Sequence, residues 1–248
     1  MSDRIAAKLL AEFIGTFALI FIGAGAAAVV GGGAGLPGVA AIAFAHGLTV
    51  MAFAFAYGTV SGGHFNPSVT VAVLAAGAMR VGEAAGYVVS QLAGGILGAL
   101  LLRAVLGGTG TSLGTPDLAH NLGLGATTLT VTPWAGYVIE AVLGFFLSTV
   151  VLSTAVAARA GNLAPLAIGV TLIFNIIMGG PLTGAAFNPA RALGPMIATG
   201  NFNDAWLYLT APIVGAIAAA ILHAGLARLS PERPATSEPD SVARTPAE

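Results

Sequence analysis

The same short motif stands in SGGHFNPSVTVAVLA (residues 61–75) and in LTGAAFNPARALGP (residues 182–195). It consists of Asn-Pro and a small residue: Asn66-Pro67-Ser68 in the first stretch and Asn188-Pro189-Ala190 in the second. Each copy stands where a Gly-containing loop passes into a short apolar run. These runs are too short to cross a membrane, since a spanning helix needs about 20 residues. The sequence therefore predicts two half-length helices that enter a membrane and end inside it.

The composition indicates an integral membrane protein. Of the 248 residues, 56% are hydrophobic and 8% are charged, and the mean hydropathy is +0.91, whereas soluble domains carry about 25% charged residues. The net charge of −1 offers no basic patch for a nucleic acid, and the lack of cysteine excludes disulfide and thiolate chemistry. Lys8 is the single lysine beside eight arginines, a bias that suggests a GC-rich bacterial genome.

Six apolar stretches predict full membrane spans, at residues 5–30, 39–57, 83–106, 134–157, 164–178 and 205–229. The first reads as a span rather than a cleavable signal peptide. The half-helices should cover residues 66–77 and 188–199, and a polar loop should cover residues 107–133.

The spans divide into two halves, at about residues 5–106 and 134–229, within one domain at residues 1–229. Three full spans in each half is an odd number, so the second half must enter the membrane from the opposite side. The prediction is an all-α membrane protein with six transmembrane helices and two re-entrant half-helices in an inverted repeat, which places a site near the midplane. Residues 230–248 are rich in Pro, Glu, Ser and Thr, which predicts a disordered tail.

The distribution of basic residues predicts the orientation. With both termini in the cytoplasm, seven of the nine basic residues lie on the cytoplasmic side, and Arg103 and Arg191 lie on the outer side. The protein is therefore expected to be a multi-pass protein of the cell (inner) membrane with a cytoplasmic tail.

The chemistry of the motif favours a pore. Asn is a favoured N-cap and Pro a favoured first helical residue. The Asn oxygen then accepts a backbone N–H of its own helix, while its NH₂ group is expected to point into the space ahead. Two such amides, with the positive ends of two helix dipoles, would bind a water oxygen and repel cations. The preceding loops should offer a row of backbone carbonyls, from Gly62, Gly63, His64, Gly184 and Ala186.

With Glu12 and Glu140, the stretches SGGHFNPSVT and TGAAFNPARALGP resemble the aquaporin or major intrinsic protein family, from about Ala11 to Leu226. The resemblance implies a pore in each subunit of a homotetramer in the lipid bilayer, with no cofactor and no metal. It also implies that the two buried acids accept N–H groups of the re-entrant loops, although a proton relay is the alternative. Ser68 departs from the family, which usually has Ala there.

The resemblance further places a narrow filter at His46, Ile176, Ala185 and Arg191. With no aromatic ring besides the imidazole, this set resembles the plant tonoplast intrinsic proteins, some of which pass water with ammonia, urea or hydrogen peroxide. The arginine should offer donors and repel cations. His46 could instead be a packing residue, and His120 could reach the outer mouth or be a solvated loop residue.

The predicted function is a passive channel for water, with ammonia, urea and hydrogen peroxide as further neutral solutes, that excludes protons and ions. A glycerol facilitator is the nearest alternative, but it usually has Asp after Asn-Pro-Ala-Arg, where this chain has Ala192. A secondary transporter would need a coupling-ion site, and no midplane acid is expected to face a substrate cavity. An enzyme is disfavoured because the four histidines are scattered and no nucleophile–base pair or metal cluster stands out.

Overall fold

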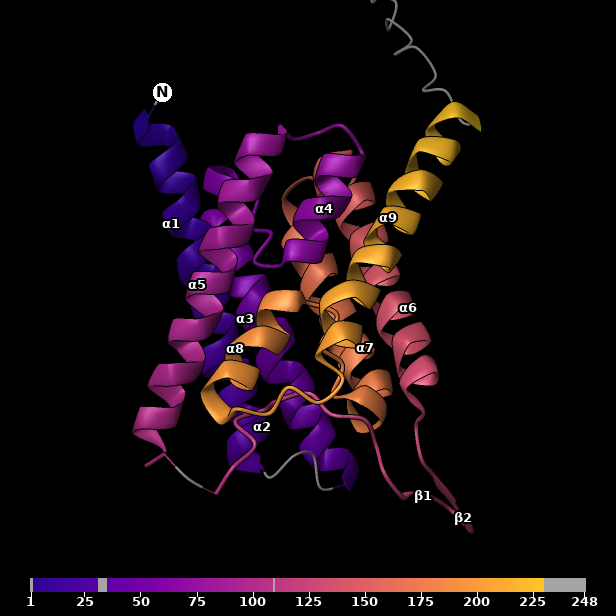
Figure 1. Cartoon of the computed structure of the whole chain (residues 1–248). Helices are drawn as coiled ribbons and strands as arrows, with labels where there is room; N and C mark the ends of the chain where they lie inside the picture. Colours follow the sequence, from indigo (N-terminus) through magenta and orange to yellow (C-terminus); the bar gives the residue numbers. More distant parts are fainter. Residues whose placement is uncertain (1, 31–34, 109, 230–248) are drawn as a thin grey trace, which may run out of the picture.

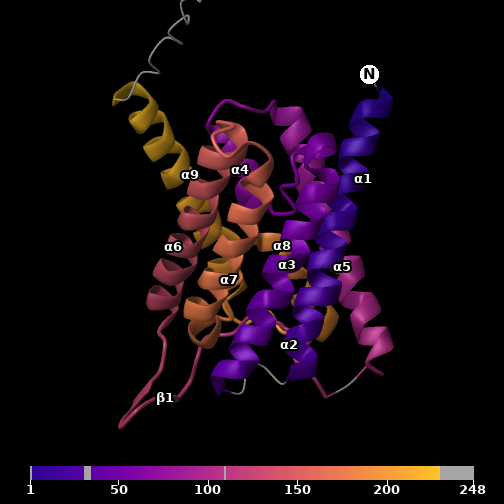
Figure 2. The same cartoon turned by 180° about the vertical axis from the view of Figure 1, so that it is seen from behind.

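The computed structural model describes residues 2–30, 35–108 and 110–229, which form a bundle of helices with roughly common direction (Figure 1). In these ranges six helices are long and apolar enough to cross a membrane: Asp3–Val30, Pro37–Ser61, Val81–Val105, Pro133–Val156, Gly161–Thr183 and Ala205–Leu229. The first helix begins and the last helix ends at the same end of the bundle, here called the terminal side (Figures 1 and 2). The opposite end is called the far side. The predicted tail at residues 230–248 lies outside the described residues.

The first span comprises α1 (Ser2–Ala18), the π-helix η1 (Leu19–Ala24) and α2 (Gly25–Val30). The next two are α3 (Gly35–Ser61) and α5 (Val81–Val105). The fourth is α6 (Pro133–Val151) with the π-helix η2 (Leu152–Val156). A 3₁₀ turn, η3 (Gly161–Leu163), leads into α7 (Ala164–Thr183), and the last span is α9 (Ala205–Leu229). The half-helices are α4 (Pro67–Ala75) and α8 (Pro189–Thr199).

Three local features differ from the sequence prediction. The helix α3 continues to Ser61, although its span was expected to end at Tyr57. The helix α7 continues to Thr183 through Pro181, although the stretch after Met178 was expected to be loop. Proline is tolerated inside membrane helices, where neighbouring helices and local adjustments satisfy the freed backbone groups. The long loop on the far side contains an unpredicted antiparallel hairpin of β1 (Leu122–Leu124) and β2 (Thr127–Leu129).

The helices pack as an inverted repeat. The pair α1 and α5 corresponds to the pair α6 and α9, and α8 lies against α5 as α4 lies against α9. Figure 1 shows α4 on the terminal side and α8 on the far side. The central helices α3 and α7 meet at Gly47 and Gly169, where a Cβ on either glycine would lie 2.6–2.7 Å from the other's carbonyl oxygen. Glycine at both positions therefore permits the close contact between the two halves.

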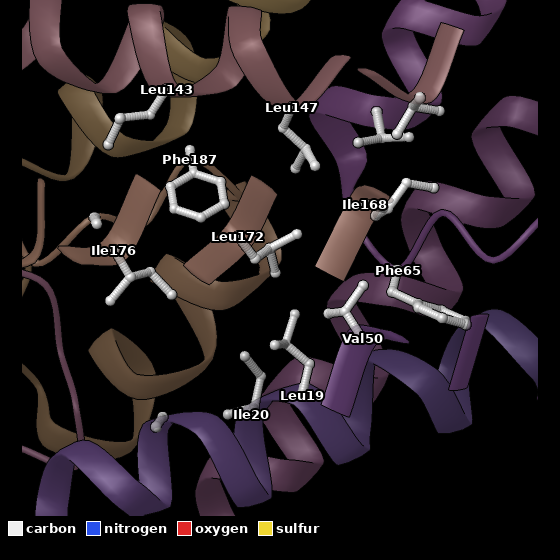
Figure 3. Packing of buried hydrophobic residues seen from close by; sticks show 14 of the residues in the cluster. Leu19, Ile20, Val50, Phe65, Leu143, Leu147, Ile168, Leu172, Ile176 and Phe187 are labelled. Atoms are coloured by element: carbon white, nitrogen blue, oxygen red, sulfur yellow. The ribbon is translucent and has the colours of Figure 1, made fainter. Parts of the chain in front are cut away.

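Apolar side chains from both halves meet in the centre of the bundle. Leu19, Val50, Leu147 and Leu172 lie there (Figure 3). Outward-facing apolar residues cover the bundle, as a lipid-facing surface requires. On the far side, Trp134 and Trp206 lie with ring centroids 5.8 Å apart at the starts of α6 and α9, a position typical of the membrane–water boundary.

Candidate functional site

Each half-helix begins at an asparagine that caps its first turn. The Oδ1 atom of Asn66 accepts a hydrogen bond from the N–H of Ser68 at 2.8 Å. Asn188 accepts bonds from the N–H groups of Ala190 and Arg191 at 3.0 and 3.2 Å. A proline follows each asparagine at the first helical position, where its missing N–H would have no helical partner in any case. The N-termini of α4 and α8 consequently meet inside the bundle, and their positive dipole ends add there.

The sequence predicted that the asparagine NH₂ groups point into open space, but each of them also donates a hydrogen bond to the opposite loop. The Nδ2 group of Asn66 donates to the carbonyl of Phe187 at 3.0 Å, and that of Asn188 donates to the carbonyl of Phe65 at 3.0 Å. One amide hydrogen of each asparagine therefore joins the two re-entrant loops. Both asparagines also line a cavity at the centre of the bundle, between Ile168 and Arg191, so the second hydrogen remains for a molecule inside it.

Ser68 adds a further contact between the halves. Its Oγ lies 2.8 Å from Oδ1 of Asn66 and 3.2 Å from the carbonyl oxygen of Phe187. The side chain is fully buried, so the hydroxyl is accommodated with partners in reach. Ala190, the corresponding residue of α8, has no hydroxyl with which to repeat this contact.

The loops before the asparagines are twisted in the same way. Gly62, Gly63 and Phe65 have positive φ angles of 92°, 65° and 48°. In the second loop Ala185 and Phe187 have φ angles of 44° and 29°. A non-glycine residue in the left-handed region costs roughly 1–2 kcal/mol, so other contacts must hold these residues in place.

Glu12 holds the first loop. Its Oε1 accepts bonds from the N–H of His64 at 3.0 Å and from Oγ of Ser61 at 2.7 Å. Its Oε2 accepts bonds from the N–H of Phe65 at 2.7 Å and from Nε2 of Gln91 at 2.8 Å. The carboxyl group is fully buried, and its four donors fix the loop on the side away from the cavity.

Glu140 holds the second loop in the same manner. It accepts bonds from the N–H groups of Ala186 and Phe187 at 2.9 and 2.5 Å, and from Oγ1 of Thr183 at 2.6 Å. The hydroxyl of Tyr208 donates to the carbonyl of Thr183 at 2.9 Å. The two carboxyl groups therefore bond corresponding N–H groups in the two halves.

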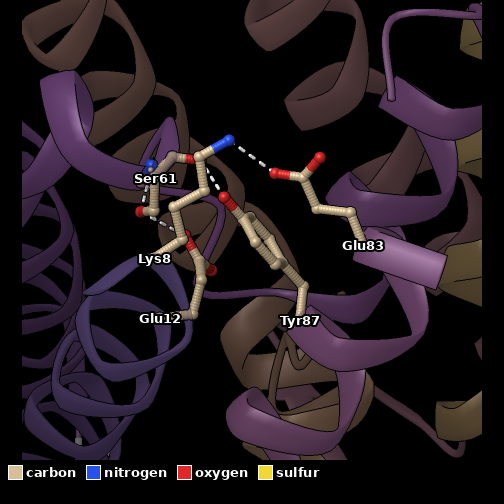
Figure 4. A network of polar contacts seen from close by, with 6 residues as sticks. Lys8, Glu12, Ser61, Glu83 and Tyr87 are labelled. Carbon is tan, nitrogen blue, oxygen red and sulfur yellow. Dashed lines mark hydrogen bonds and ion pairs between the residues drawn. The ribbon is translucent and has the colours of Figure 1, made fainter. Parts of the chain in front are cut away.

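Figure 4 shows the polar network around the first carboxyl group. The hydroxyl of Tyr87 donates to the carbonyl of Ser61 at 2.7 Å, and Lys8 pairs with Glu83 at 2.6 Å nearer the terminal side. The two tyrosines were not among the site residues predicted from the sequence. Aligning the repeats would have found them, because Tyr87 follows the first motif asparagine by 21 residues and Tyr208 follows the second by 20.

Three cavities follow one another through the bundle. A terminal-side cavity includes Gly62 and Ile168 in its wall. A central cavity reaches from Ile168 to Arg191. A far-side cavity shares Arg191 and is bordered by Ser112 and Thr115. Because each junction shares a wall residue, the cavities form one row from side to side.

The central cavity has walls of contrasting chemistry. The polar part comes from the two motif asparagines and the re-entrant loops. The apolar part comes from four different spans: Leu19, Val50, Leu147 and Leu172. The loop residues predicted to offer carbonyls divide among the cavities, with Gly63, His64 and Ala186 in the central one. Gly184 borders the far-side cavity and Gly62 the terminal-side cavity.

The four predicted filter residues are only partly brought together. His46 lines the central cavity, Ile176 lines the far-side cavity, and Arg191 lines both. Ala185 is 2% exposed and does not appear in the wall of either cavity; Ala186 lines the central one instead. The positive φ of Ala185 turns the chain there, so that the following residue faces the cavity.

Arg191 is buried at the junction of the central and far-side cavities. Its Nη1 donates to the carbonyl of Gly114 at 2.9 Å, and its Nη2 donates to the carbonyl of Gly184 at 3.3 Å. Its Nε has no protein partner in the described part of the chain. The long loop thus reaches the guanidinium through Gly114, whereas His120 is exposed and lies in the wall of none of the three cavities.

His46 lines the central cavity and holds one ring nitrogen in a hydrogen bond to its own helix. Its Nδ1 lies 2.9 Å from the carbonyl oxygen of Ile42. A carbonyl can only accept, so Nδ1 carries the hydrogen of the neutral ring and Nε2 is the acceptor; the tautomer is assigned from this bond. Within the described residues Nε2 has no partner, and the side chain is 3% exposed.

The polar groups of the central cavity are distributed unevenly between the halves. The motif asparagines are 122 residues apart, and the same separation relates His46 to Ile168 and Val69 to Arg191. All four line the central cavity. The far side of the cavity thus has an imidazole and a guanidinium, and the corresponding positions on the terminal side have apolar residues.

Comparisons with known proteins agree with this arrangement. The model of the family described as "Major intrinsic protein" matches residues 2–223. The chain is 39% identical over 216 residues to Aquaporin NIP1-2 of Oryza sativa subsp. japonica, which covers 86% of this chain and 69% of that protein. It is 39% identical over 218 residues to Nodulin-26 of Glycine max, covering 87% and 76%. With Aquaporin TIP4-4 of Zea mays it shares 39% identity over 225 residues, covering 88% and 85%.

A solved structure shows the same fold. The aquaglyceroporin from Plasmodium falciparum superposes with a TM-score of 0.74, covering 91% of this chain and 98% of that chain at 22% sequence identity. The plant relatives include NIP and TIP proteins, so the likeness of the filter to tonoplast proteins and the bacterial source stay predictions. With its inverted repeat, paired Asn-Pro motifs and matched family model, the chain belongs to the major intrinsic protein, or aquaporin, family.

Proposed function

We propose that the chain forms a passive channel that conducts water in single file along the three cavities. The observation that carries this proposal is the central cavity, where Asn66 and Asn188 face an apolar wall across the meeting point of two helix N-termini. A water oxygen can accept the free amide hydrogens, and its hydrogens can reach the loop carbonyls. The apolar wall offers no competing partner, so each water molecule keeps a defined orientation.

The same geometry supports the exclusion of ions. Two positive helix ends point at the centre, and Arg191 adds a full positive charge at the next junction. A cation would meet both barriers after losing much of its hydration shell, whereas a neutral molecule would not. Lining groups and electrostatic barriers of this kind set selectivity in narrow pores.

The solute range rests on His46, Ile176, Ala185 and Arg191. We propose that ammonia, urea and hydrogen peroxide also pass, because the set combines one acceptor and one cationic donor with small or aliphatic side chains. Ala185 contributes by its small size and by turning the loop, rather than through the cavity wall. His120 is left out of the proposed filter because it is exposed.

The roles of Glu12 and Glu140 follow from their partners. Among the described residues, the hydrogen bonds that these carboxyl groups accept come from the re-entrant loops or from Ser61, Gln91 and Thr183 behind them. We propose that they support the loops and do not relay protons. We also propose a homotetramer in the cell membrane, with the terminal side in the cytoplasm and residues 1–229 as one channel domain.

The proposal is tested in liposomes that contain the purified protein. Vesicle volume is followed by light scattering, first after an osmotic step that reports water flow and then in gradients of glycerol, urea or ammonia. Protein-free liposomes serve as the comparison. Fast, unsaturable water flow with a low activation energy is expected. Saturable flux that depends on an ion gradient would indicate a transporter, and glycerol flow without enhanced water flow would favour the facilitator.

A further inference from the structure

Gly23 lies against the imidazole ring of His46. It belongs to η1, the π-helical turn of the first span, which also contains Leu19 of the cavity wall. A Cβ built on Gly23 would lie 2.6 Å from Cδ2 of His46 and 2.8 Å from Cγ and Nε2. Ordinary contacts lie at 3.4–4 Å, so the imidazole can occupy its observed position only because residue 23 has no side chain.

The ring has little freedom to move elsewhere. On its own helix, Nδ1 is bonded to the carbonyl of Ile42. Behind it stands the backbone of η1 at Gly23. The remaining side is the central cavity, whose wall His46 shares with Arg191. A force from the direction of η1 therefore moves the ring toward the guanidinium and narrows the passage between them.

We propose that Gly23 is a specificity-determining residue of the channel, because it seats the His46 ring against the first span and so sets the width of the passage beside Arg191. The inference rests on the proposed channel function and extends it to a residue outside the cavity wall. To regain a contact of 3.4 Å after an added methyl group, the ring must retreat by roughly 0.8 Å. Single turns of π-helix often occur at functional sites, and here the turn carries the glycine that the ring requires.

A narrower passage discriminates by size among neutral solutes. Urea and glycerol are wider than water and should be slowed more. A barrier that rises more for urea than for water slows urea more than water. The urea-to-water permeability ratio of Gly23→Ala should therefore fall severalfold relative to the wild type, while water flow falls less.

The experiment uses the full chain in liposomes, with water and urea flow measured on the same preparations. Gly25→Ala is the matched control. It makes the same change two residues further along the span, where the new Cβ would come within 3.2 Å only of a flexible Leu102 methyl group. Leu102 lines none of the three cavities, so the permeability ratio of this control should equal that of the wild type.

The decisive variant combines Gly23→Ala with His46→Ala. With the ring removed, the added methyl group has nothing to displace, and the ratio should match that of His46→Ala alone.

If the ratio stays low in the double variant, or if Gly23→Ala leaves it unchanged, the inference is overturned. If Gly23→Ala inserts poorly and the double variant inserts normally, the collision with the ring is supported; poor insertion of both overturns it. A wild-type protein that conducts no water would refute the proposed function itself, which is a separate result.

Discussion

Replacing Glu12 with glutamine tests the support of the first re-entrant loop. Glu12 accepts four hydrogen bonds, and an amide of the same shape keeps only one acceptor oxygen. The less costly orientation places the new NH₂ group beside Ser61, because that hydroxyl can turn round and accept. The N–H of His64 then loses its partner. The opposite orientation would remove the acceptor from the N–H groups of both Phe65 and Gln91.

The expected loss of stability can be worked out from these contacts. One buried N–H without a partner costs about 1–3 kcal/mol. The bonds that remain weaken because their acceptor is no longer charged, which adds about 1 kcal/mol. Glu12→Gln should therefore lower the free energy of unfolding by roughly 2–4 kcal/mol, which corresponds to roughly 5–15 °C in unfolding temperature. Glu12→Ala strands at least three donors and should not accumulate as folded protein.

The assay is thermal unfolding of the purified protein in detergent, followed by the helical circular dichroism signal. Glu83→Gln is the matched control, because this carboxylate pairs with Lys8 at a partly exposed position, with side-chain exposures of 20% and 36%. Partly exposed pairs contribute about 0–1 kcal/mol, so its unfolding temperature should change little. The reasoning would be refuted if Glu12→Gln unfolded at the wild-type temperature or if Glu83→Gln lost as much stability.

Three further predictions concern the centre of the bundle. The chain has no cysteine, so mercurials should not block it through a thiol. Val50→Cys in the cavity wall should make water flow sensitive to mercury, and the outward-facing Leu48→Cys should not. Equal inhibition of both variants would contradict the assigned path. Ser68→Ala should lower the free energy of unfolding by about 0.5–1.5 kcal/mol with water flow retained, and a thermal melt that shows no loss would mean that the hydroxyl bonds contribute nothing. Arg191→Val, which copies the corresponding Val69, should keep water flow and raise cation conductance across planar bilayers; a conductance that stays at the wild-type level would argue against the charge barrier.

The sequence was sufficient for the fold because its strongest signals are local. Apolar length predicts the six spans, and Asn-Pro predicts where α4 and α8 begin, since a cap depends on its own first turn. The partners of the asparagine amides were not predictable in this way. Asn66 bonds to a carbonyl 121 residues away, and nothing within the first motif specifies that contact.

The candidate site was predicted less completely for a similar reason. Ala185 was assigned to the filter by position in the chain, but its orientation depends on backbone twist. For His120 the sequence left open the outer mouth and a solvated loop position, because the choice depends on the path of a long loop. The loop brings Gly114 to the guanidinium, while His120 remains exposed. The importance of Gly23 is invisible in sequence, because it depends on a ring from another helix.

The crossed bonds between each asparagine and the opposite loop have a consequence for the order of assembly during synthesis. Asn66 needs the carbonyl of Phe187, and Asn188 needs the carbonyl of Phe65. A nascent chain that has emerged only as far as residue 133 holds the first amide and carbonyl without these partners, and unpaired polar groups in hydrocarbon cost several kcal/mol each. The first re-entrant loop can therefore complete its central hydrogen bonds only when the second loop arrives, so the centre of the channel forms after both halves have entered the membrane.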